Sequence, residues 1–288
     1  MTIVVTGATG HLGRLTVAAL LERGVPAAGI RALGRNTERL APLAGQGVQT
    51  AAIDFEKPET LDVAFSGADA LLLVSGSEIG KRVPQHANAI EAAKRTGVGR
   101  LVYTSAPRAT TSDLVLAPEH AATERLLAES GLPVTILRNN WYTENYTGQV
   151  DTAAVHGELI GSAGDGRVAS ASRKDYAEAA AVVLTEGGHE GAVYELSGDV
   201  AWTFAELASA ISGLLGRDVV YRSVTPAEHR ASLIAAGLPE GTADFLVALD
   251  GNIRDGALAE TTDALTGLLG RPTTPLAVGL AADHAAAR

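Results

Sequence analysis

TIVVTGATGHLGRLTVAALLERG, residues 2–24, predicts a strand, a glycine-rich turn and a helix in immediate succession. Residues 3–5 are apolar and β-branched, as in a buried strand. Glycines follow at positions 7, 10 and 13, and apolar side chains then recur at helical spacing until Gly24 ends the helix. This order of elements is typical of a turn that binds the pyrophosphate of a dinucleotide. An ordinary turn between a strand and a helix is the alternative.

The three glycines have different physical roles in this interpretation. Gly7 permits a tight exit from the strand, Gly10 lets a pyrophosphate approach the backbone, and Gly13 lets the helix pack closely on the strand. The first turn of the helix then presents backbone amides that have no partner within the helix, and these amides attract an anion. We therefore expect residues 7–13 to bind the cofactor.

The composition of the 288-residue chain excludes several classes of site. Hydrophobic residues make up 46% of the chain, which is enough for a sizeable core. With 23 basic and 33 acidic residues the formal net charge is −10, and this balance does not favour nucleic acid as a ligand. The absence of cysteine excludes disulfides and thiolate metal sites, and the spacing of the seven histidines indicates no metal site.

The sequence shows neither a targeting signal nor a membrane-spanning stretch. Met1 leads directly into the first strand without a secretion signal, and no stretch approaches the roughly 20 apolar residues of a membrane span. We therefore expect a cytoplasmic protein that does not enter a membrane.

Predicted strands alternate with predicted helices through the first two thirds of the chain. After the strand at residues 3–5, strands are expected at residues 30–34, 49–53, 69–74, 100–104, 134–138 and 193–196. The intervening helices include residues 84–96, 118–130 and 173–184. This alternation predicts an α/β fold with a doubly wound parallel sheet of the Rossmann type.

Arg35 follows the second strand, where the adenosine ribose of a bound dinucleotide lies in such folds. An acidic side chain here would bind the two ribose hydroxyls of NAD, whereas an arginine pairs with the 2′-phosphate of NADP. We therefore predict NADPH as the cofactor, although Arg35 can also be only a solvated surface side chain. Asp54, at the end of the third strand, is expected to face the adenine.

A small polar loop, SGSEIG at residues 75–80, follows the continuous apolar strand at residues 69–74. Loops at the carboxyl ends of parallel strands bind ligands in α/β proteins. Ser75, Ser77, Glu78 and Ile79 are therefore expected to line the pyrophosphate and the nicotinamide ribose. A plain connecting loop is the alternative.

A second loop, NNWYTENY at residues 139–146, follows the strand at residues 134–138. Trp141, Tyr142 and Tyr146 are three of only twelve aromatic residues in the chain. Their concentration at the end of a strand predicts a pocket for a flat, apolar ligand. Packing in a core beneath a second domain is the competing interpretation.

The last third of the chain carries no catalytic motif. A helix at residues 204–215, a strand at residues 219–222 and several alanine-rich helices are expected there. We predict two domains. Residues 1–143 plus 167–199 form the NADP-binding Rossmann domain, and residues 144–166 plus 200–288 form a smaller, mostly helical substrate domain.

Several of the stretches described above resemble the corresponding stretches of proteins in the NmrA-like, atypical branch of the extended short-chain dehydrogenase/reductase superfamily. Within it the chain is most similar to bacterial NADPH:quinone oxidoreductases of the second type, and next to triphenylmethane-dye reductases. The resemblance covers nearly the whole chain and includes VTGATGHLG, LLLVSGSEIG, VYTSAPRATTSDL, LRNNWYTENY, DGRVASASRKDYAEAAA, HEGAVYELSGD and GRPTTPLA. The first of these marks a large superfamily, whereas the SGSEIG and LRNNWYTENY stretches are much more specific.

The resemblance implies roles for individual residues. Residues 7–12 would hold the pyrophosphate, and Arg35 would hold the 2′-phosphate. Residues 77–79 and 139–144 would contact the nicotinamide half, and Ser170 would complete the set of residues around the cofactor. With Asp54 and Ser75, the expected cofactor-binding residues are Gly7, Ala8, Thr9, Gly10, His11, Leu12, Gly13, Arg35, Asp54, Ser75, Ser77, Glu78, Ile79, Asn139, Asn140, Trp141, Tyr142, Thr143, Glu144 and Ser170.

One departure from the wider superfamily concerns catalysis. The usual Tyr-x-x-x-Lys pair is replaced by His120-Ala-Ala-Thr-Glu124. His120 and Glu124 share a helix face at i and i+4, so they can shuttle a proton or form only a local surface pair. Asn139 is expected to orient a carbonyl or the nicotinamide carboxamide. The catalytic candidates are therefore Asn139 and His120.

The expected activity is hydride transfer from NADPH to a quinone or a similar electrophilic aromatic acceptor, a small molecule. A quinone needs less acid assistance than a ketone, which fits the missing tyrosine and lysine. The alternative is a non-catalytic NADP(H)-binding redox sensor that regulates a partner protein, as NmrA itself is thought to do. A sugar-nucleotide epimerase is disfavoured because that chemistry needs the absent tyrosine. Both a monomer and a homodimer remain open.

Overall fold

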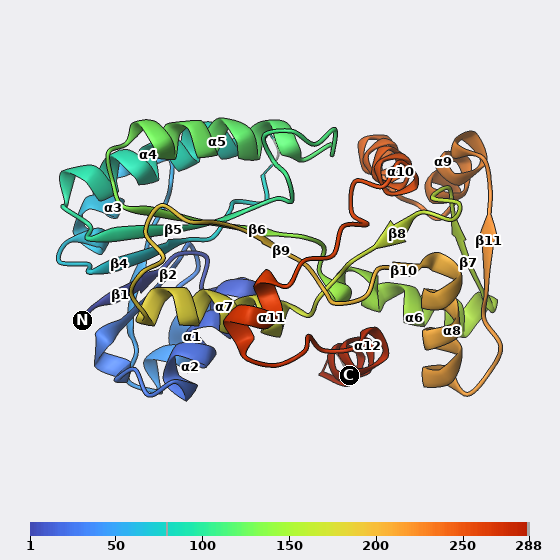
Figure 1. Ribbon diagram of the computed structural model, residues 1–288, viewed down its shortest axis with the longest axis horizontal. Coiled ribbons are helices and arrows are strands. Elements are labelled where there is room, and N and C mark those ends of the chain that lie inside the picture. Colours follow the sequence, from blue (N-terminus) through green and yellow to red (C-terminus); the bar gives the residue numbers. More distant parts are fainter. Residues whose placement is uncertain (79, 287–288) are drawn as a thin grey trace.

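The computed structural model describes residues 1–78 and 80–286. Its larger part is a seven-stranded sheet in the order β3-β2-β1-β4-β5-β6-β9, in which all neighbouring strands are parallel (Figure 1). The strands are β1 (Ile3–Val5), β2 (Ile30–Gly34), β3 (Gln49–Ala52), β4 (Ala70–Leu73), β5 (Arg100–Ser105), β6 (Val134–Asn139) and β9 (Val193–Leu196). The strand order reverses between β1 and β4, which confirms the predicted doubly wound fold.

Helices cover both faces of this sheet (Figure 1). One face carries α3 (Pro58–Phe65), α4 (Arg82–Arg95) and α5 (Ala117–Glu129), and the other carries α1 (His11–Glu22), α2 (Ala41–Ala44), α7 (Arg173–Thr185) and α11 (Ala264–Leu269). Short 3-10 helices, η1 (Ala27–Gly29) and η2 (Glu38–Leu40), flank β2. In β1, Ile3 and Val5 pack on the sheet face that α1 covers, and Val4 packs on the face that α4 covers. Both faces of this strand are buried, which explains why it is apolar at every position.

The smaller part has its own core and two short pairs of strands (Figure 1). Strand β7 (Glu158–Gly161) pairs in parallel with β11 (Val220–Ser223), and β8 (Arg167–Val168) pairs antiparallel with β10 (Trp202–Thr203). The helices are η3 (Thr143–Tyr146), α6 (Thr147–His156), α8 (Phe204–Leu215), α9 (Pro226–Ala235), α10 (Glu240–Arg254) and α12 (Leu276–Ala286). Helix α8 has the predicted bounds, whereas β7, β8 and β10 were not predicted.

The chain returns to the larger part near its C-terminal end. Helix α11 packs against α7, and Leu265 is fully buried in the core of the larger part. Residues 264–269 therefore lie beside the large sheet, although the sequence-based division assigns them to the smaller domain. Helix α12 then crosses back to η3, α6 and α8.

Candidate functional site

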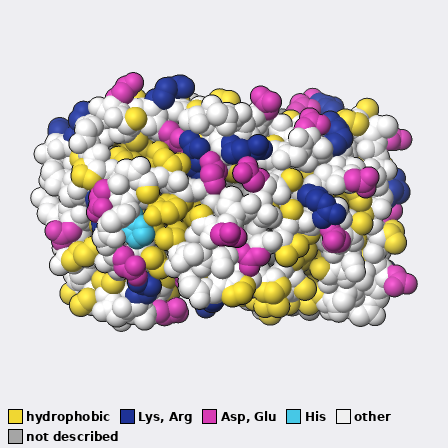
Figure 2. Space-filling model, in the orientation of Figure 1, with side chains coloured by type: hydrophobic (Ala, Val, Ile, Leu, Met, Phe, Trp, Pro, Cys, Tyr) yellow, Lys and Arg dark blue, Asp and Glu magenta, His cyan; other side chains and the backbone are white. Residues whose placement is uncertain are grey.

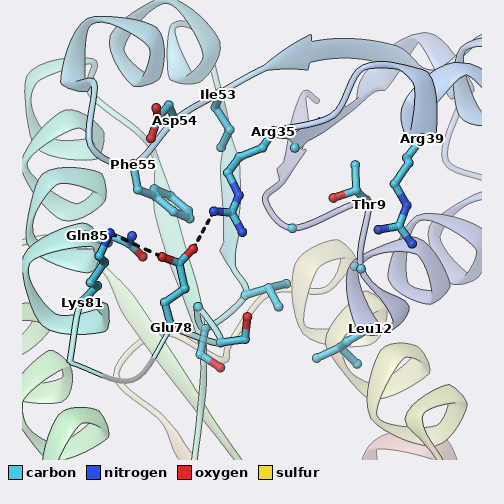
Figure 3. A pocket seen from close by; sticks show the side chains of 18 of the residues that line it. Thr9, Leu12, Arg35, Arg39, Ile53, Asp54, Phe55, Glu78, Lys81 and Gln85 are labelled. Carbon is cyan, nitrogen blue, oxygen red and sulfur yellow. Dashed lines mark hydrogen bonds and ion pairs between the residues drawn. The ribbon is translucent and has the colours of Figure 1, made fainter.

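A groove of about 560 Å³ opens at the carboxyl ends of β1, β2, β3 and β4 (Figure 3). Most of the predicted cofactor-binding residues in the first third of the chain line it, namely Gly7, Thr9, Gly10, His11, Leu12, Gly13, Arg35, Asp54, Ser75, Ser77 and Glu78. Ala8 lies behind the groove wall, where its backbone N–H donates to the carbonyl of Leu33 at 2.9 Å. Ile79 lies outside the described residues. The structure thus gathers one part of the predicted site into a single concave surface.

The glycine turn has the geometry that an anion requires. Gly7 has φ +63°, which a residue with a side chain rarely adopts. A Cβ at Gly13 would overlap the carbonyl oxygen of Gly7 and lie 2.9 Å from the nitrogen of Ala8, whereas a Cβ at Gly10 would meet only the Gly7 oxygen, at 3.2 Å. Helix α1 begins at His11 after Gly10, which has no side chain to cap it. Its first amides therefore face the groove free to bind a phosphate.

The end of the groove near β2 carries exposed charges (Figure 3). Arg35 Nη1 donates to Glu78 Oε1 at 2.5 Å, and Lys81 Nζ lies 3.9 Å from Glu78 Oε2 and 3.2 Å from Glu56 Oε1. Arg35 is 71% exposed, so a ligand can reach its guanidinium group. Glu78 lies at the Arg35 end of the groove, whereas the resemblance placed it beside the nicotinamide half.

The loop after β4 is held by hydrogen bonds to buried side chains. The N–H of Ser75 donates to Thr104 Oγ1 at 2.9 Å, and the N–H of Gly76 donates to His86 Nε2 at 3.0 Å. Arg82 Nε donates to the carbonyl of Gly76 at 2.7 Å. The N–H and the carbonyl of Gly76 are therefore both held by side chains of helix α4.

His86 has one defined tautomer because of its other partner. Thr123 Oγ1 donates to the carbonyl of Glu119 at 3.0 Å, so it accepts the proton of His86 Nδ1, which lies 3.0 Å away. His86 Nε2 is then free to accept from Gly76. Burial lowers the pKa of His86 to about 3, assisted by the positive charge of Arg82, and the ring is neutral at neutral pH.

His120 and Glu124 do not form the predicted pair. His120 Nδ1 lies 2.8 Å from the hydroxyl of Tyr103, and burial lowers the pKa of His120 to about 3. Glu124 instead accepts from Ser105 Oγ at 2.6 Å and from Arg138 Nη2 at 2.6 Å. Both are only 5% exposed, so the interpretation as a local surface pair is wrong. Neither lines the groove.

The loop after β6 is held largely by bonds within the protein. Asn140 Nδ2 donates to the carbonyl of Leu258 at 3.3 Å, and Thr143 Oγ1 lies 2.9 Å from Ser170 Oγ. The carboxylate of Glu144 accepts the N–H of Arg173 at 2.9 and 3.0 Å, at the start of α7.

Asn139 differs from its neighbours in that loop. Its amide Nδ2 donates to the hydroxyl of Tyr142 at 3.2 Å, while its Oδ1 is buried without a partner in the described chain, as is Oδ1 of Asn140. A buried oxygen without a partner is costly, so these two atoms are candidates for binding a ligand. Of the predicted cofactor-binding residues in this loop, Trp141 alone lines either of the two large cavities.

The three aromatic residues of this loop point to different places. Tyr142 packs edge-on against Tyr176, with ring centroids 5.3 Å apart, and Arg173 lies 5.2 Å above its ring. Trp141 and Tyr146 instead line a second cavity, of about 550 Å³, in the smaller part. The predicted cluster of three is therefore wrong for Tyr142, for which packing in the core is the correct interpretation.

The second cavity brings together residues that the sequence did not single out, among them His229 and Asp250. These two are more than 20 residues apart in the chain and lie on different helices, α9 and α10. No spacing pattern in the sequence links them. In the part of the chain that the structure describes, no three His, Asp or Glu residues are grouped so as to bind a metal, and no helix has the length and apolar character to cross a membrane.

Comparisons with known proteins agree with this geometry. A family model described as NAD(P)H-binding matches residues 7–187. The chain is 46% identical over 275 residues to quinone oxidoreductase 2 of Escherichia coli, covering 96% of each protein, and 31% identical to an NAD(P)H azoreductase of Xenophilus azovorans, covering 99% of this chain and 98% of that one.

Two solved structures are also similar. The Escherichia coli NADPH-dependent quinone oxidoreductase complexed with NADPH has a TM-score of 0.94 at 46% identity, covering 98% of this chain and 99% of that one. The triphenylmethane reductase of Citrobacter sp. complexed with NADP(H) has a TM-score of 0.93 at 39% identity. This match covers 98% of this chain and 100% of that one.

Proposed function

The chain belongs to the NAD(P)H-binding family, in the NmrA-like, atypical branch of the short-chain dehydrogenases/reductases, and from this we propose that it is an NADPH-dependent quinone oxidoreductase. It transfers a hydride from NADPH to a quinone or a similar electrophilic aromatic acceptor. The observation that carries this function is the groove of glycine-turn amides with Arg35 at its end.

The groove fits NADPH at two points. The amides at the start of α1 bind the pyrophosphate, and the space left by Gly10 lets it approach the backbone. Arg35 binds the 2′-phosphate and exchanges Glu78 for it. Asp54, Ser75 and Ser77 complete the groove between these points.

The nicotinamide half lies toward the loop after β6 in this proposal. The nicotinamide supplies the hydride, and the protein supplies orientation. Asn139 binds the carboxamide, whose NH₂ group donates to its unpartnered amide oxygen. Asn140, Thr143, Glu144 and Ser170 hold the loop in place through their mutual and backbone hydrogen bonds.

His120 supports the fold in this scheme. Its hydrogen bond to Tyr103 and its absence from the groove lining favour a structural role over proton transfer.

The acceptor is a small molecule that reaches Trp141 and Tyr146 in the second cavity. On the face shown in Figure 2, basic and acidic side chains are interspersed without a continuous basic patch, and with a net charge of −10 this does not favour nucleic acid. The protein acts in the cytoplasm, away from a membrane, as a monomer or a homodimer.

Steady-state kinetics test this function. The initial rate of NADPH oxidation by benzoquinone is measured by absorbance at several concentrations of both substrates. Double-reciprocal plots of these rates should give intersecting lines, because cofactor and acceptor bind together before hydride transfer. Parallel lines, or a yellow protein on purification, would indicate a bound flavin and contradict direct transfer. Tight NADPH binding with no turnover for any quinone would favour the redox sensor.

A further inference from the structure

The cavity in the smaller part has the size and lining of a site for a small aromatic molecule. Its volume of about 550 Å³ falls within the range of ligand pockets, roughly 300 to 1,000 Å³. Trp141, Tyr146 and Phe204 supply aromatic surface, and Leu233 and Leu249 supply aliphatic surface. No lysine or arginine is among the described residues that line it. This lining suits an uncharged aromatic compound.

Two polar atoms in the lining have no partner within the described protein. They are the hydroxyl of Tyr146 and Oε1 of Gln149. Tyr146 is only 5% exposed, and its ring is fixed edge-on against Trp202, with centroids 5.0 Å apart. An unsatisfied buried polar atom costs about 1–3 kcal/mol. A ligand with an oxygen or hydroxyl group in the cavity would remove this cost.

His229 adds an ionisable group to the same lining. It is 6% exposed, and its Nδ1 lies 3.1 Å from Asp250 Oδ2 and 3.1 Å from Ser162 Oγ. Asp250, 7% exposed, is held in turn by the N–H of Ser162, which donates to the same Oδ2 at 2.6 Å. The imidazole is therefore held by Ser162 Oγ beside a fixed carboxylate, and enzymes use a carboxylate near a histidine to position it for proton transfer.

The other nitrogen of His229 is the one available to a ligand. Because Ser162 Oγ donates to Asp250 Oδ2 at 3.4 Å, it accepts the Nδ1 proton of His229, so the Nε2 atom is left, and no hydrogen bond to it is made by the residues that the structure describes. The other ionisable groups nearby are accounted for. Burial raises the pKa of Tyr146, with the charge of Asp250 adding to it, and the pKa of Tyr221 is raised for the same reasons. Glu158 is paired with Arg222 at 2.9 Å.

We propose that His229, oriented by Asp250, is a catalytic residue that donates a proton to the acceptor oxygen in this cavity, beside the hydroxyl of Tyr146. This rests on the proposed function, since the acceptor is the quinone reduced there. The quinone gains a hydride, two electrons with one hydrogen, and NADPH is oxidised to NADP⁺. The resulting charge on the quinone oxygen is neutralised as the Nε2–H bond of the imidazolium breaks and an O–H bond forms. Asp250 stays ionised, and solvent returns a proton to Nε2.

The first test compares His229→Gln with His189→Gln. His189 lies in the larger part and lines neither the groove nor the cavity, so it is the control. General acid catalysis typically contributes about 10² to 10⁴, and because a quinone needs less assistance we expect a loss in kcat of about tenfold to a hundredfold for His229→Gln. The solvent deuterium isotope effect on kcat should change with it, while the Kd for NADPH should not. His189→Gln should behave as the wild type.

The second test does not depend on turnover. Hydroquinone binding is measured by calorimetry without cofactor, in the wild type, His229→Gln, Tyr146→Phe and Tyr221→Phe. Loss of one hydrogen bond of about 0.5–1.5 kcal/mol should weaken binding about two- to tenfold in the first two variants. Tyr221→Phe is the control, because its hydroxyl also lacks a partner but does not line the cavity. The thermal stability of Tyr146→Phe should not fall, since no protein bond is lost and the unpartnered hydroxyl is removed.

The outcomes separate the two proposals. An inactive wild type that binds hydroquinone through Tyr146 and His229 would contradict the proposed function and the proton transfer, and would leave only a binding site. An active wild type with unaltered kcat and isotope effect in His229→Gln would overturn the role of His229 alone. Equal hydroquinone binding in all four proteins would overturn the cavity as the acceptor site.

Discussion

The groove beside β1 and the cavity in the smaller part are of similar volume, about 560 and 550 Å³, but they are built differently. The groove offers backbone amides and exposed charges, and the glycine turn that forms its floor is a single run of sequence. The cavity offers aromatic surface and a buried histidine–carboxylate pair drawn from several distant elements. Anion binding therefore depends on backbone shape, whereas acceptor chemistry depends on a few side chains.

The buried histidines show the same contrast. His86, behind the groove, accepts a backbone N–H and has no carboxylate partner, so it is held neutral. His229, in the cavity, is bonded to Ser162 Oγ and lies 3.1 Å from a carboxylate oxygen of Asp250. One histidine supports a loop, and the other is placed to exchange a proton.

The largest expected effect is that of Gly10→Val on the groove. The side chain would occupy the space through which the pyrophosphate approaches, so NADPH binding should weaken by more than about a hundredfold. The fold should survive, because a Cβ at Gly10 meets only the Gly7 oxygen at 3.2 Å. Calorimetry and circular dichroism measure the two effects.

Hydroquinone binding in the cavity is the control for that variant and should be unchanged. Normal NADPH binding by Gly10→Val would mean that the glycine turn is only structural. Gly13→Ala should differ by destabilising the protein itself, because its Cβ would lie 2.9 Å from the backbone nitrogen of Ala8.

Arg35→Ala should have the next largest effect. A charge-assisted hydrogen bond is worth about 1.5–3 kcal/mol, so the Kd for NADPH should rise about tenfold to a hundredfold while the Kd for NADH changes little. Arg14→Ala, which removes an exposed charge outside the groove lining, is the control. Equal losses for both cofactors would contradict the assignment of Arg35 to the 2′-phosphate.

Acid should weaken the larger part through His86 and His120. Burial lowers both pKa values to about 3, so below the ordinary histidine pKa of about 6.5 the unfolded chain binds protons that the folded protein excludes. The free energy of unfolding should therefore fall as pH falls from about 6.5 towards 3, by up to about 1.4 kcal/mol per pH unit for each histidine.

Urea unfolding at several pH values measures this slope. His120→Gln should reduce the slope, and His156→Gln, at an exposed position, should not. An identical slope in both variants would show that His120 does not contribute to the acid sensitivity.

The smallest expected effect is that of Glu78→Gln. An exposed ion pair contributes about 0–1 kcal/mol, so removing the carboxylate from Arg35 should tighten NADPH binding by at most about fivefold. The affinity for NADH should not change. Glu56→Gln, which removes the partner of Lys81 instead, is the control. Weaker NADPH binding would mean that Glu78 itself contacts the cofactor.

The local features of this fold were predictable from the sequence because adjacent residues produce them. The apolar strands, the turn at Gly7–Gly13 and the helix at Phe204–Leu215 each lie within one short stretch. Strands β8 and β10 were not predictable, since a pair of two-residue strands has too few positions to show a period.

The parts of the site that depend on contacts between residues far apart in the sequence were not predictable. Helical spacing placed His120 and Glu124 on one face, but it could not show that Tyr103 and Arg138 would engage them separately. Tyr142 has extended backbone geometry, in which successive side chains point to opposite sides, so it faces away from Trp141. The pairing of His229 with Asp250 exists only once α9 and α10 have packed together.

The return of the chain to α7 bears on how the protein is made. Asp175 is fully buried, and its carboxylate accepts from Arg271 Nη2 at 2.8 Å and from the N–H of Thr274 at 2.8 Å, almost 100 residues later. A buried carboxylate without these partners is strongly destabilising. During synthesis, the larger part therefore stays incomplete until residues 271–274 have been added, and until then the face of α7 that α11 covers stays exposed.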